Sequence, residues 1–93
     1  DVSEVVLAGA GKEARAWQRV LAPEGVRVCH WLDIDPRKVG RVLHGAPVLR
    51  PAELSLEGRR MMVAIGLRGA RDSFRQTARE LGWREGIDFI CVA

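Results

Sequence analysis

The feature that most constrains the fold is a short apolar run that ends directly at a glycine loop. Residues 4–8 (Glu-Val-Val-Leu-Ala) have the apolar character of a buried strand, and residues 9–11 (Gly-Ala-Gly) follow at once. In residues 12–21 the apolar positions recur at helical spacing, and Pro23 and Gly25 end the pattern. A strand, a tight glycine turn and a helix therefore open the chain.

Four further apolar runs predict strands, over residues 26–32, 46–49, 61–66 and 89–92. A second amphipathic segment, residues 70–81, predicts a helix between the last two of these strands. The expected order of elements is strand, helix, three strands, helix, strand. Strands of such uniformly apolar character are typical of a parallel sheet with helices on both faces.

The pattern predicts a small Rossmann-like α/β domain of three layers, with a parallel five-stranded sheet. Because crossovers between parallel strands are right-handed, we expect the strand order 3-2-1-4-5. The chain of 93 residues suffices for one domain, residues 1–93. It opens at Asp1 without an initiator methionine and soon enters a strand, so we expect a C-terminal fragment of a longer chain.

Composition indicates a soluble globular protein, with 47% hydrophobic and 29% charged residues. The net charge of +3 comes from scattered arginines with acids among them, so we expect no nucleic acid partner. Cys29 and Cys91 lie inside apolar runs, which predicts buried thiols in a reducing compartment. No apolar run is long enough for a membrane span and no secretory leader is recognisable, so we expect a cytoplasmic location.

The glycine loop carries the strongest functional signal. Gly9, Gly11 and Ala14 fit the pattern Gly-x-Gly-x-x-Gly/Ala of dinucleotide-binding turns, which lies between a strand and a helix. Asp33 follows at the carboxyl end of the next strand, where it could accept a hydrogen bond from a ribose hydroxyl, and Asp35 is near it. Turns between a strand and a helix also favour glycine for structural reasons alone, so both interpretations stay open.

A second glycine loop is expected to face the first. In the order 3-2-1-4-5, the turns after strands one and four flank the point where the strand order reverses. Gly66, Arg68 and Gly69 would then lie opposite Lys12 and form a pocket for an anion. The alternative is that Lys12 and Arg68 are solvated loop charges. The candidate ligand-binding residues are Gly9, Gly11, Lys12, Asp33, Asp35, Gly66, Arg68 and Gly69.

The sequence indicates neither a catalytic residue nor a metal site. Asp33 and Asp35 could pair on a divalent ion, but the neighbouring sequence supplies no further ligand to complete an oxygen shell. His30 and His44 lie in different elements, so a zinc site with a cysteine would need distant segments to converge. Neither thiol is placed where a helix N-terminus would activate it. We expect a binding domain rather than a complete enzyme.

Several segments together resemble a known domain. They are residues 7–11 (Leu-Ala-Gly-Ala-Gly), Arg15, Trp17, residues 31–40 (Trp-Leu-Asp-Ile-Asp-Pro-Arg-Lys-Val-Gly), 45–48 (Gly-Ala-Pro-Val), 63–66 (Val-Ala-Ile-Gly), 68–71 (Arg-Gly-Ala-Arg) and 86–89 (Gly-Ile-Asp-Phe). Over nearly the whole chain, this set resembles the Rossmann-like domain appended C-terminally to some bacterial family 2 glycosyltransferases. It is more distantly similar to the N-terminal domain of bacterial sugar acetyltransferases, which binds the uridine nucleotide of a nucleotide-sugar. Lys12, Glu13 and Ala14 stand where that domain has Gly-His-Gly, so its acetyl transfer is not expected here.

The resemblance implies an accessory domain of a bacterial glycosyltransferase. Its partner would be the upstream catalytic domain of the same chain, which would carry out the glycosyl transfer. A nucleotide or nucleotide-sugar would bind at Gly9, Gly11, Asp33 and Asp35.

Two other functions stay open. In an NAD(P)-binding fragment of an oxidoreductase, Arg37 and Lys38 could meet a 2′-phosphate, although the third strand follows the second without a proper crossover helix. In an interaction module, the glycines would be structural and no ligand would bind.

Overall fold

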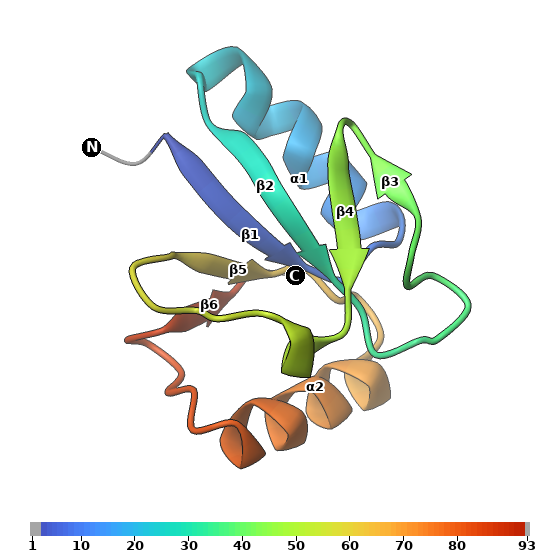
Figure 1. Ribbon diagram of the computed structural model, residues 1–93, viewed down its shortest axis with the longest axis vertical. Coiled ribbons are helices and arrows are strands. Elements are labelled where there is room, and N and C mark those ends of the chain that lie inside the picture. The colour runs from blue at the N-terminus through green and yellow to red at the C-terminus, as the bar shows by residue number, and fades with distance from the viewer. Residues whose placement is uncertain (1–2, 93) are drawn as a thin grey trace.

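A central sheet lies between two helices in the computed structural model, which describes residues 3–92 (Figure 1). The strands are β1 (Glu4–Ala8), β2 (Arg27–Leu32), β3 (Val42–Leu43), β4 (Ala46–Leu49), β5 (Met61–Val63) and β6 (Phe89–Cys91). The helices are α1 (Lys12–Leu21) and α2 (Arg68–Glu80), with the 3-10 turns η1 (Ala22–Glu24) and η2 (Pro51–Glu53). The predicted three-layer α/β arrangement is confirmed.

The strand order is β3-β4-β2-β1-β5-β6. β1 pairs in parallel with both β2 and β5, and these two strands pair in parallel with β4 and β6 respectively. Without β3, this order is the predicted 3-2-1-4-5. The strand order therefore reverses between β1 and β5. A ligand site is expected at the carboxyl ends of these two strands.

The prediction of a five-stranded, purely parallel sheet is wrong, because β3 adds a sixth and antiparallel strand within residues 3–92. β3 and β4 form a hairpin whose turn residues, His44 and Gly45, have φ of +49° and +78°. Positive φ at both central residues gives a turn the twist that suits a hairpin. His-Gly is not the usual Asn-Gly sequence of such turns, and a two-residue strand shows no alternation, so the pattern did not reveal β3.

Two apolar cores, one on each side of the sheet, hold the three layers together. In β1, Val5 and Leu7 pack into the core that contains Ala14 of α1, whereas Val6 and Ala8 pack into the core of α2. Successive side chains of a strand point to opposite faces, so a strand that is buried on both faces is apolar throughout. This burial explains the continuous apolar runs of the sequence.

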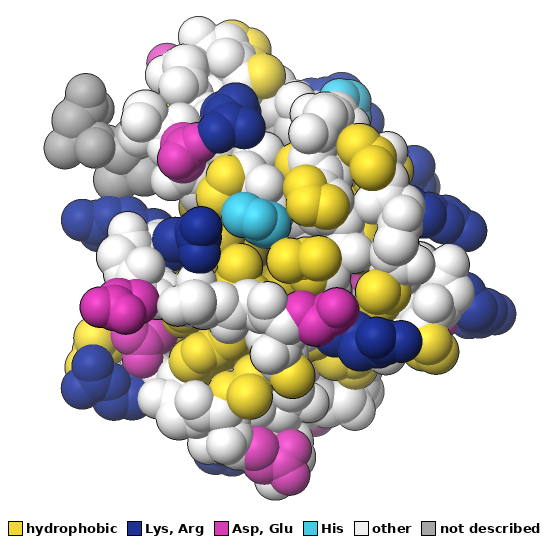
Figure 2. All heavy atoms as spheres, viewed as in Figure 1, with side chains coloured by type: hydrophobic (Ala, Val, Ile, Leu, Met, Phe, Trp, Pro, Cys, Tyr) yellow, Lys and Arg dark blue, Asp and Glu magenta, His cyan; other side chains and the backbone are white. Residues whose placement is uncertain are grey.

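The connection from β4 to β5 leaves part of one sheet face without a helix. Residues 50–60 contain only the short turn η2. On the side of the molecule opposite α1, hydrophobic side chains gather around a histidine at the surface (Figure 2). His30 of β2 lies beside Val6 of β1 in register and is half-buried. β2 is therefore covered more completely on its α1 side.

Neither helix has the length and apolar character needed to cross a membrane, within the residues that the structure describes. Both cysteines are free thiols and are half-buried rather than fully buried. Asp1, on which the expectation of a longer chain rests, lies outside the described residues, as do Val2 and Ala93.

Candidate functional site

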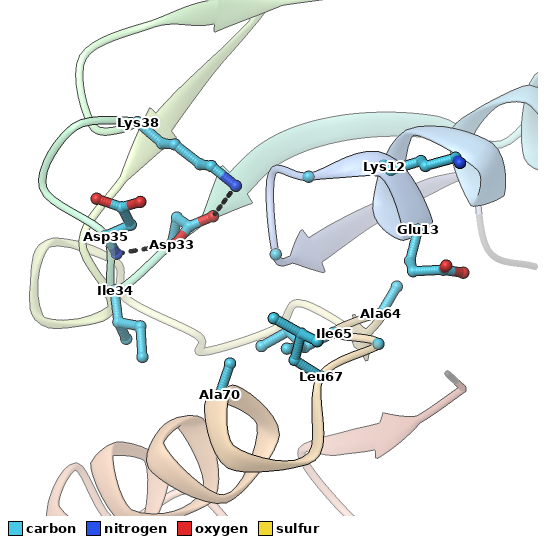
Figure 3. A pocket seen from close by; sticks show the side chains of 13 residues that line it. Lys12, Glu13, Asp33, Ile34, Asp35, Lys38, Ala64, Ile65, Leu67 and Ala70 are labelled. Atoms are coloured by element: carbon cyan, nitrogen blue, oxygen red, sulfur yellow. Dashed lines mark hydrogen bonds and ion pairs between the residues drawn. The ribbon is translucent and has the colours of Figure 1, made fainter.

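A crevice of about 560 Å³ opens where β1, β2 and β5 end (Figure 3). It lies at the point where the strand order reverses, which is the usual ligand site of open α/β sheets. The loops after β1 and β5 form facing walls, and the loop after β2 closes one end. The lining residues are Gly9, Gly11, Lys12, Glu13, Asp33, Ile34, Asp35, Lys38, Ala64, Ile65, Gly66, Leu67 and Ala70.

Gly9 holds the glycine loop against the end of β5. Its φ is +98°, a conformation that favours glycine, and a Cβ added there would lie 2.9 Å from the backbone oxygen of Ala64. Its N–H donates to the carbonyl of Leu32 over 2.6 Å. Backbone from β1, β2 and the segment after β5 therefore meets at a position that only glycine fits without strain.

Gly11 leaves the beginning of α1 open. It is the N-cap of α1, and no side chain caps the helix. A Cβ added to Gly11 would lie 3.3 Å from the ammonium nitrogen of Lys38. The first N–H groups of a helix have no partner within the helix and favour an anion. Because Gly11 has no side chain, the crevice extends to this helix end, and the ammonium of Lys38 lies next to it.

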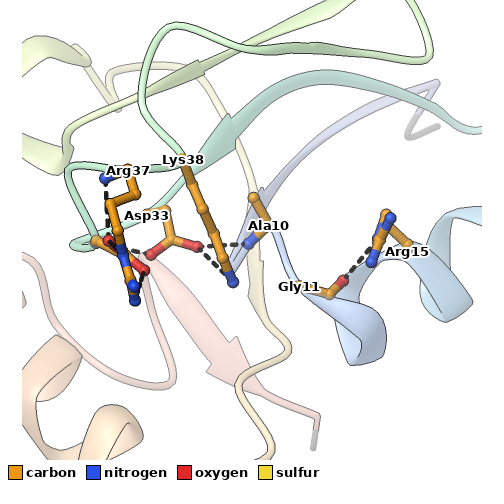
Figure 4. Close-up of polar contacts among 7 residues, drawn as sticks. Ala10, Gly11, Arg15, Asp33, Arg37 and Lys38 are labelled. Atoms are coloured by element: carbon orange, nitrogen blue, oxygen red, sulfur yellow. Dashed lines mark hydrogen bonds and ion pairs between the residues drawn. The ribbon is translucent and has the colours of Figure 1, made fainter.

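Asp33 holds the loops of the crevice in place (Figure 4). Its Oδ2 accepts a hydrogen bond from the N–H of Ala10 at 2.9 Å, and its Oδ1 accepts one from the N–H of Asp35 at 2.8 Å. The ammonium of Lys38 lies 3.9 Å from Oδ2, and only 12% of the Asp33 side chain is exposed. The carboxylate thereby joins the glycine loop to the turn after β2.

Asp35 is engaged by Arg37, two residues further on. Its Oδ1 accepts from the backbone N–H and from Nε of Arg37, at 3.0 and 3.1 Å, and its Oδ2 accepts from Nη2 at 3.0 Å. These hydrogen bonds, the side-chain ones first, lower the pKa of the Asp35 carboxyl below its ordinary value. Asp35 thus lines the crevice as an ionised carboxylate that already has a partner.

The loop after β5 approaches the glycine loop, as predicted. A Cβ added to Gly9 would lie 3.0 Å from Cγ1 of Ile65, and one added to Gly66 would lie 2.9 Å from Cγ of Glu13 at the beginning of α1. Arg71 of α2 donates from Nε to the carbonyl of Ile65 at 3.2 Å and from Nη2 to that of Gly66 at 3.4 Å.

Two predicted site residues do not belong to the crevice. Arg68 and Gly69 are exposed in the first turn of α2 and do not line it, so the expected convergence of Arg68 with Lys12 is wrong. Arg71, further along α2, is the arginine that contacts the loop. The sequence places Arg68 directly after the loop, but α2 begins at that residue and carries it to the surface.

An apolar wall, which the sequence did not reveal, faces the glycine loop. Ile34, Ile65, Leu67 and Ala70 line this part of the crevice, and Figure 3 shows their side chains directed towards its centre. Leu67 is 77% exposed and Ile34 is 39% exposed. In the sequence, only their positions next to Asp33 and Gly66 could have indicated that Ile34 and Leu67 belong to the site. Isolated apolar loop residues are common on protein surfaces and do not by themselves predict a site.

The crevice combines charged and apolar side chains. Its described lining contains the cations Lys12 and Lys38 and the acids Glu13, Asp33 and Asp35, but no His, Cys, Ser, Thr or Tyr. Within residues 3–92 no three His, Cys, Asp or Glu side chains are grouped to hold a metal ion. This arrangement can hold an anion near α1 and an apolar ring near the wall.

No protein-family model matches the chain, and no curated protein does. Among solved structures, it is similar to the crystal structure of RSP, a Rex-family repressor, with a TM-score of 0.65 and 14% sequence identity. The similarity covers 97% of this chain and 51% of that chain, so this chain spans about half the length of the repressor. At this identity, the likeness supports the α/β fold alone.

Proposed function

We propose that this chain is a Rossmann-like binding domain that holds a nucleotide or nucleotide-sugar in the crevice. The observation that carries the proposal is the crevice itself, with an open helix N-terminus on one side and an apolar wall on the other. Its volume of about 560 Å³ is in the range of small-molecule sites. A nucleotide combines the two matching chemical features, a phosphate group and an apolar base.

The two ends of the ligand would occupy different parts of the crevice. The phosphates would lie against Gly11, where the uncapped N–H groups of α1 and the helix dipole favour negative charge. The base would cover Ile34 and Leu67, whose exposed apolar surface a flat ring could bury. The ribose would bridge the two ends beside Asp33.

As part of a longer chain, the domain would be an accessory part of a bacterial glycosyltransferase. The segments that resemble the C-terminal domain of such enzymes include the glycine loop, Asp33, Gly66 and Lys38, all of which line the crevice. In this role, the transfer reaction would belong to the catalytic domain upstream. An upstream glycosyltransferase domain in the same reading frame would support this role, whereas a start codon directly before Asp1 would overturn it.

A titration followed by amide NMR tests ligand binding directly. UDP, a UDP-sugar, NAD and coenzyme A would each be added to the labelled domain. We expect a uridine nucleotide to shift the amide signals of Gly9, Gly11, Lys12, Ile65 and Leu67. Shifts with NAD alone would support the oxidoreductase alternative instead. No shift with any ligand would leave an interaction module.

Two matched variants test the position of the base. Leu67→Asp places a charge on the apolar wall, and Val42→Asp places the same charge on β3, outside the crevice lining. Both side chains are mostly exposed, 77% for Leu67 and 67% for Val42, so neither change is expected to disturb a core. We expect weaker nucleotide binding in Leu67→Asp only. Equal binding by both variants would contradict the assigned wall.

A further inference from the structure

The ammonium of Lys38 lies at the centre of the crevice's polar end. The side chain reaches from the loop after β2 towards Asp33 and the glycine loop (Figure 4). Its Nζ is 3.9 Å from Oδ2 of Asp33, which is an ion pair but longer than a hydrogen bond, and 3.3 Å from where a Cβ of Gly11 would stand. Among residues 3–92, no hydrogen bond engages this Nζ. The ion pair with Asp33 thus leaves donors of the ammonium for a ligand above Gly11.

Asp33 is less available to a ligand than its position after β2 suggests. In dinucleotide-binding folds, the acid at this position accepts hydrogen bonds from ribose. Here both carboxylate oxygens already accept backbone N–H groups, from Ala10 and Asp35, and 12% of the side chain is exposed. The carboxylate keeps further acceptor sites, but its low exposure limits the access of a ribose hydroxyl to them.

The other predicted cations are placed less well for a phosphate. Lys12 extends along α1, away from Asp33 and Lys38 (Figure 3). Arg68 is exposed on α2 and does not line the crevice. Arg37 is paired with Asp35. Arg15 donates to the Gly11 carbonyl from the outer side of α1 and does not line the crevice. Of the two cations in the lining, Lys38 is the one whose ammonium lies next to Gly11.

We propose that Lys38 selects the ligand of the crevice, by binding a phosphate of a nucleoside diphosphate or of its ester above the glycine loop. This inference rests on the proposed nucleotide binding. Asp33 is a positioning residue, because it holds Lys38 and the glycine loop and leaves the ribose hydroxyls unbound. The ligand is thus recognised through its phosphates and its base, and the sugar between them is not distinguished from a deoxyribose.

The test compares variants and ligands that differ by one group. Binding of UDP, ADP, uridine, adenosine and 2′-deoxy-UDP would be measured by calorimetry and by amide shifts for the wild type, Lys38→Met, Lys38→Arg and Lys12→Met. We expect Lys38→Met to weaken UDP and ADP binding by roughly tenfold or more, the effect of a lost hydrogen bond to a charged group. Lys12→Met should weaken it by about fivefold at most, as for an exposed charge.

The nucleosides and the deoxy analogue control for a general disturbance of the site. Uridine and adenosine should shift the same amides of the wall in Lys38→Met as in the wild type, and Lys38→Arg should keep most of the affinity for UDP. 2′-Deoxy-UDP should bind as UDP does, whereas a ribose contact at Asp33 would make it weaker by roughly tenfold. Loss of nucleoside shifts in Lys38→Met would indicate a disturbed loop and contradict the assignment.

The two proposals fail in different ways. If the wild type binds none of the nucleotides, the proposed function is wrong and this inference falls with it. If the wild type binds UDP or ADP and Lys38→Met binds equally well, only the role of Lys38 is wrong. If the deoxy analogue alone loses affinity, Asp33 binds ribose after all.

Discussion

At the scale of single residues, the crevice depends on positions where side chains are absent. Gly9 and Gly66 allow backbone and side chains of neighbouring segments to approach to distances that a Cβ would occupy. The acids and cations are in contrast mostly engaged with one another, Asp33 with Lys38 and Asp35 with Arg37. The shape of the site is thus set by glycine and its polarity by paired charges.

Gly9→Ala is expected to destabilise the domain more than a matched glycine change elsewhere. Gly40 is the control, since its φ of +92° resembles the +98° of Gly9 but its added Cβ would have no atom within 4 Å. Gly40→Ala should cost about 1 kcal/mol from the backbone conformation alone. Gly9→Ala adds the clash with the Ala64 carbonyl and should cost about 2 to 4 kcal/mol in the free energy of unfolding. Urea denaturation measures the free energy of unfolding of both variants. Equal decreases in the two variants would show that the structure around Ala64 can accommodate the added Cβ and would contradict the expected clash.

His30 is expected to make stability depend on pH. Its Nδ1 is buried without a hydrogen-bond partner among the described residues. Burial first, then the charges of Arg59 and Arg27, lower the pKa of His30 below its ordinary value of 6.5. The unfolded chain therefore binds this proton more readily than the folded one, and stability falls as the pH drops through 6.5 towards the lower folded-state pKa.

The measurement is the urea midpoint at about pH 7.5 and about pH 5. His30→Gln should lose less stability between these two values than the wild type does, because its side chain does not titrate. His44→Asn serves as the control, as Asn tolerates the positive φ of the hairpin turn and the change removes the other histidine. Parallel losses in His30→Gln and the wild type would assign the pH dependence to the carboxylates.

At the scale of elements, the two helices attach to the sheet with side chains of different size. α1 has Ala14 as its one buried residue within the described chain, which lets the helix lie close to β1 and keeps its N-terminus at the crevice. α2 attaches through Phe74 and Ala78, and the Phe74 ring meets Phe89 edge to face with centroids 5.9 Å apart. Trp83 lies against the same ring at 6.4 Å.

Phe74→Ala is expected to remove most of the attachment of α2. The side chain is fully buried, so its loss removes apolar contacts and leaves a cavity, which costs about 3 to 5 kcal/mol in the free energy of unfolding. Glu80→Ala, on the exposed side of the same helix, should stay within about 0.5 kcal/mol of the wild type. Thermal and urea denaturation of both variants test this difference. A loss below about 1 kcal/mol in Phe74→Ala would contradict the assigned core.

Regular elements with strong patterns were predictable from the sequence. The helix from Lys12 to Leu21 was predicted at both ends, because apolar spacing and Pro23 define it. β3 was not predicted, because a strand of two residues is too short to show an alternation of apolar and polar residues. α2 begins at Arg68 rather than at Ala70, and this shift removes Arg68 from the crevice.

At the scale of the whole molecule, topology decided how much of the site could be predicted. Right-handed crossovers fixed the order of the parallel strands, and that order brought the two glycine loops together as expected. The loop from Ile34 to Lys38 was beyond prediction, because its course depends on hydrogen bonds of Asp33 and Asp35 that no periodic pattern reveals. Lys38 therefore entered the predictions only as a partner for a 2′-phosphate. The wall of Ile34 and Leu67 was missed for the same reason.

The shared sheet also predicts how the molecule unfolds. β1 contributes Val6 and Ala8 to one core and Val5 and Leu7 to the other, so neither core survives if β1 leaves the sheet. We therefore expect one cooperative transition, as for most single domains of this size. Far-ultraviolet circular dichroism would follow the backbone, while tryptophan fluorescence would follow both cores.

Variants on the two sides of the sheet make this test decisive. Trp31 is buried in the core of α1, and Trp83 packs against the core of α2, so replacing either tryptophan with Phe leaves the other to report on its own side. Trp17 is also replaced, so that each variant keeps a single tryptophan. In each variant, the urea midpoint from fluorescence should equal the midpoint from circular dichroism of the same variant. Adding Phe74→Ala should lower both midpoints together, although Phe74 touches only one core. A midpoint that falls for Trp83 but not for Trp31 would mean that the α1 layer folds without α2, and the crevice between them would then be assembled in a separate step.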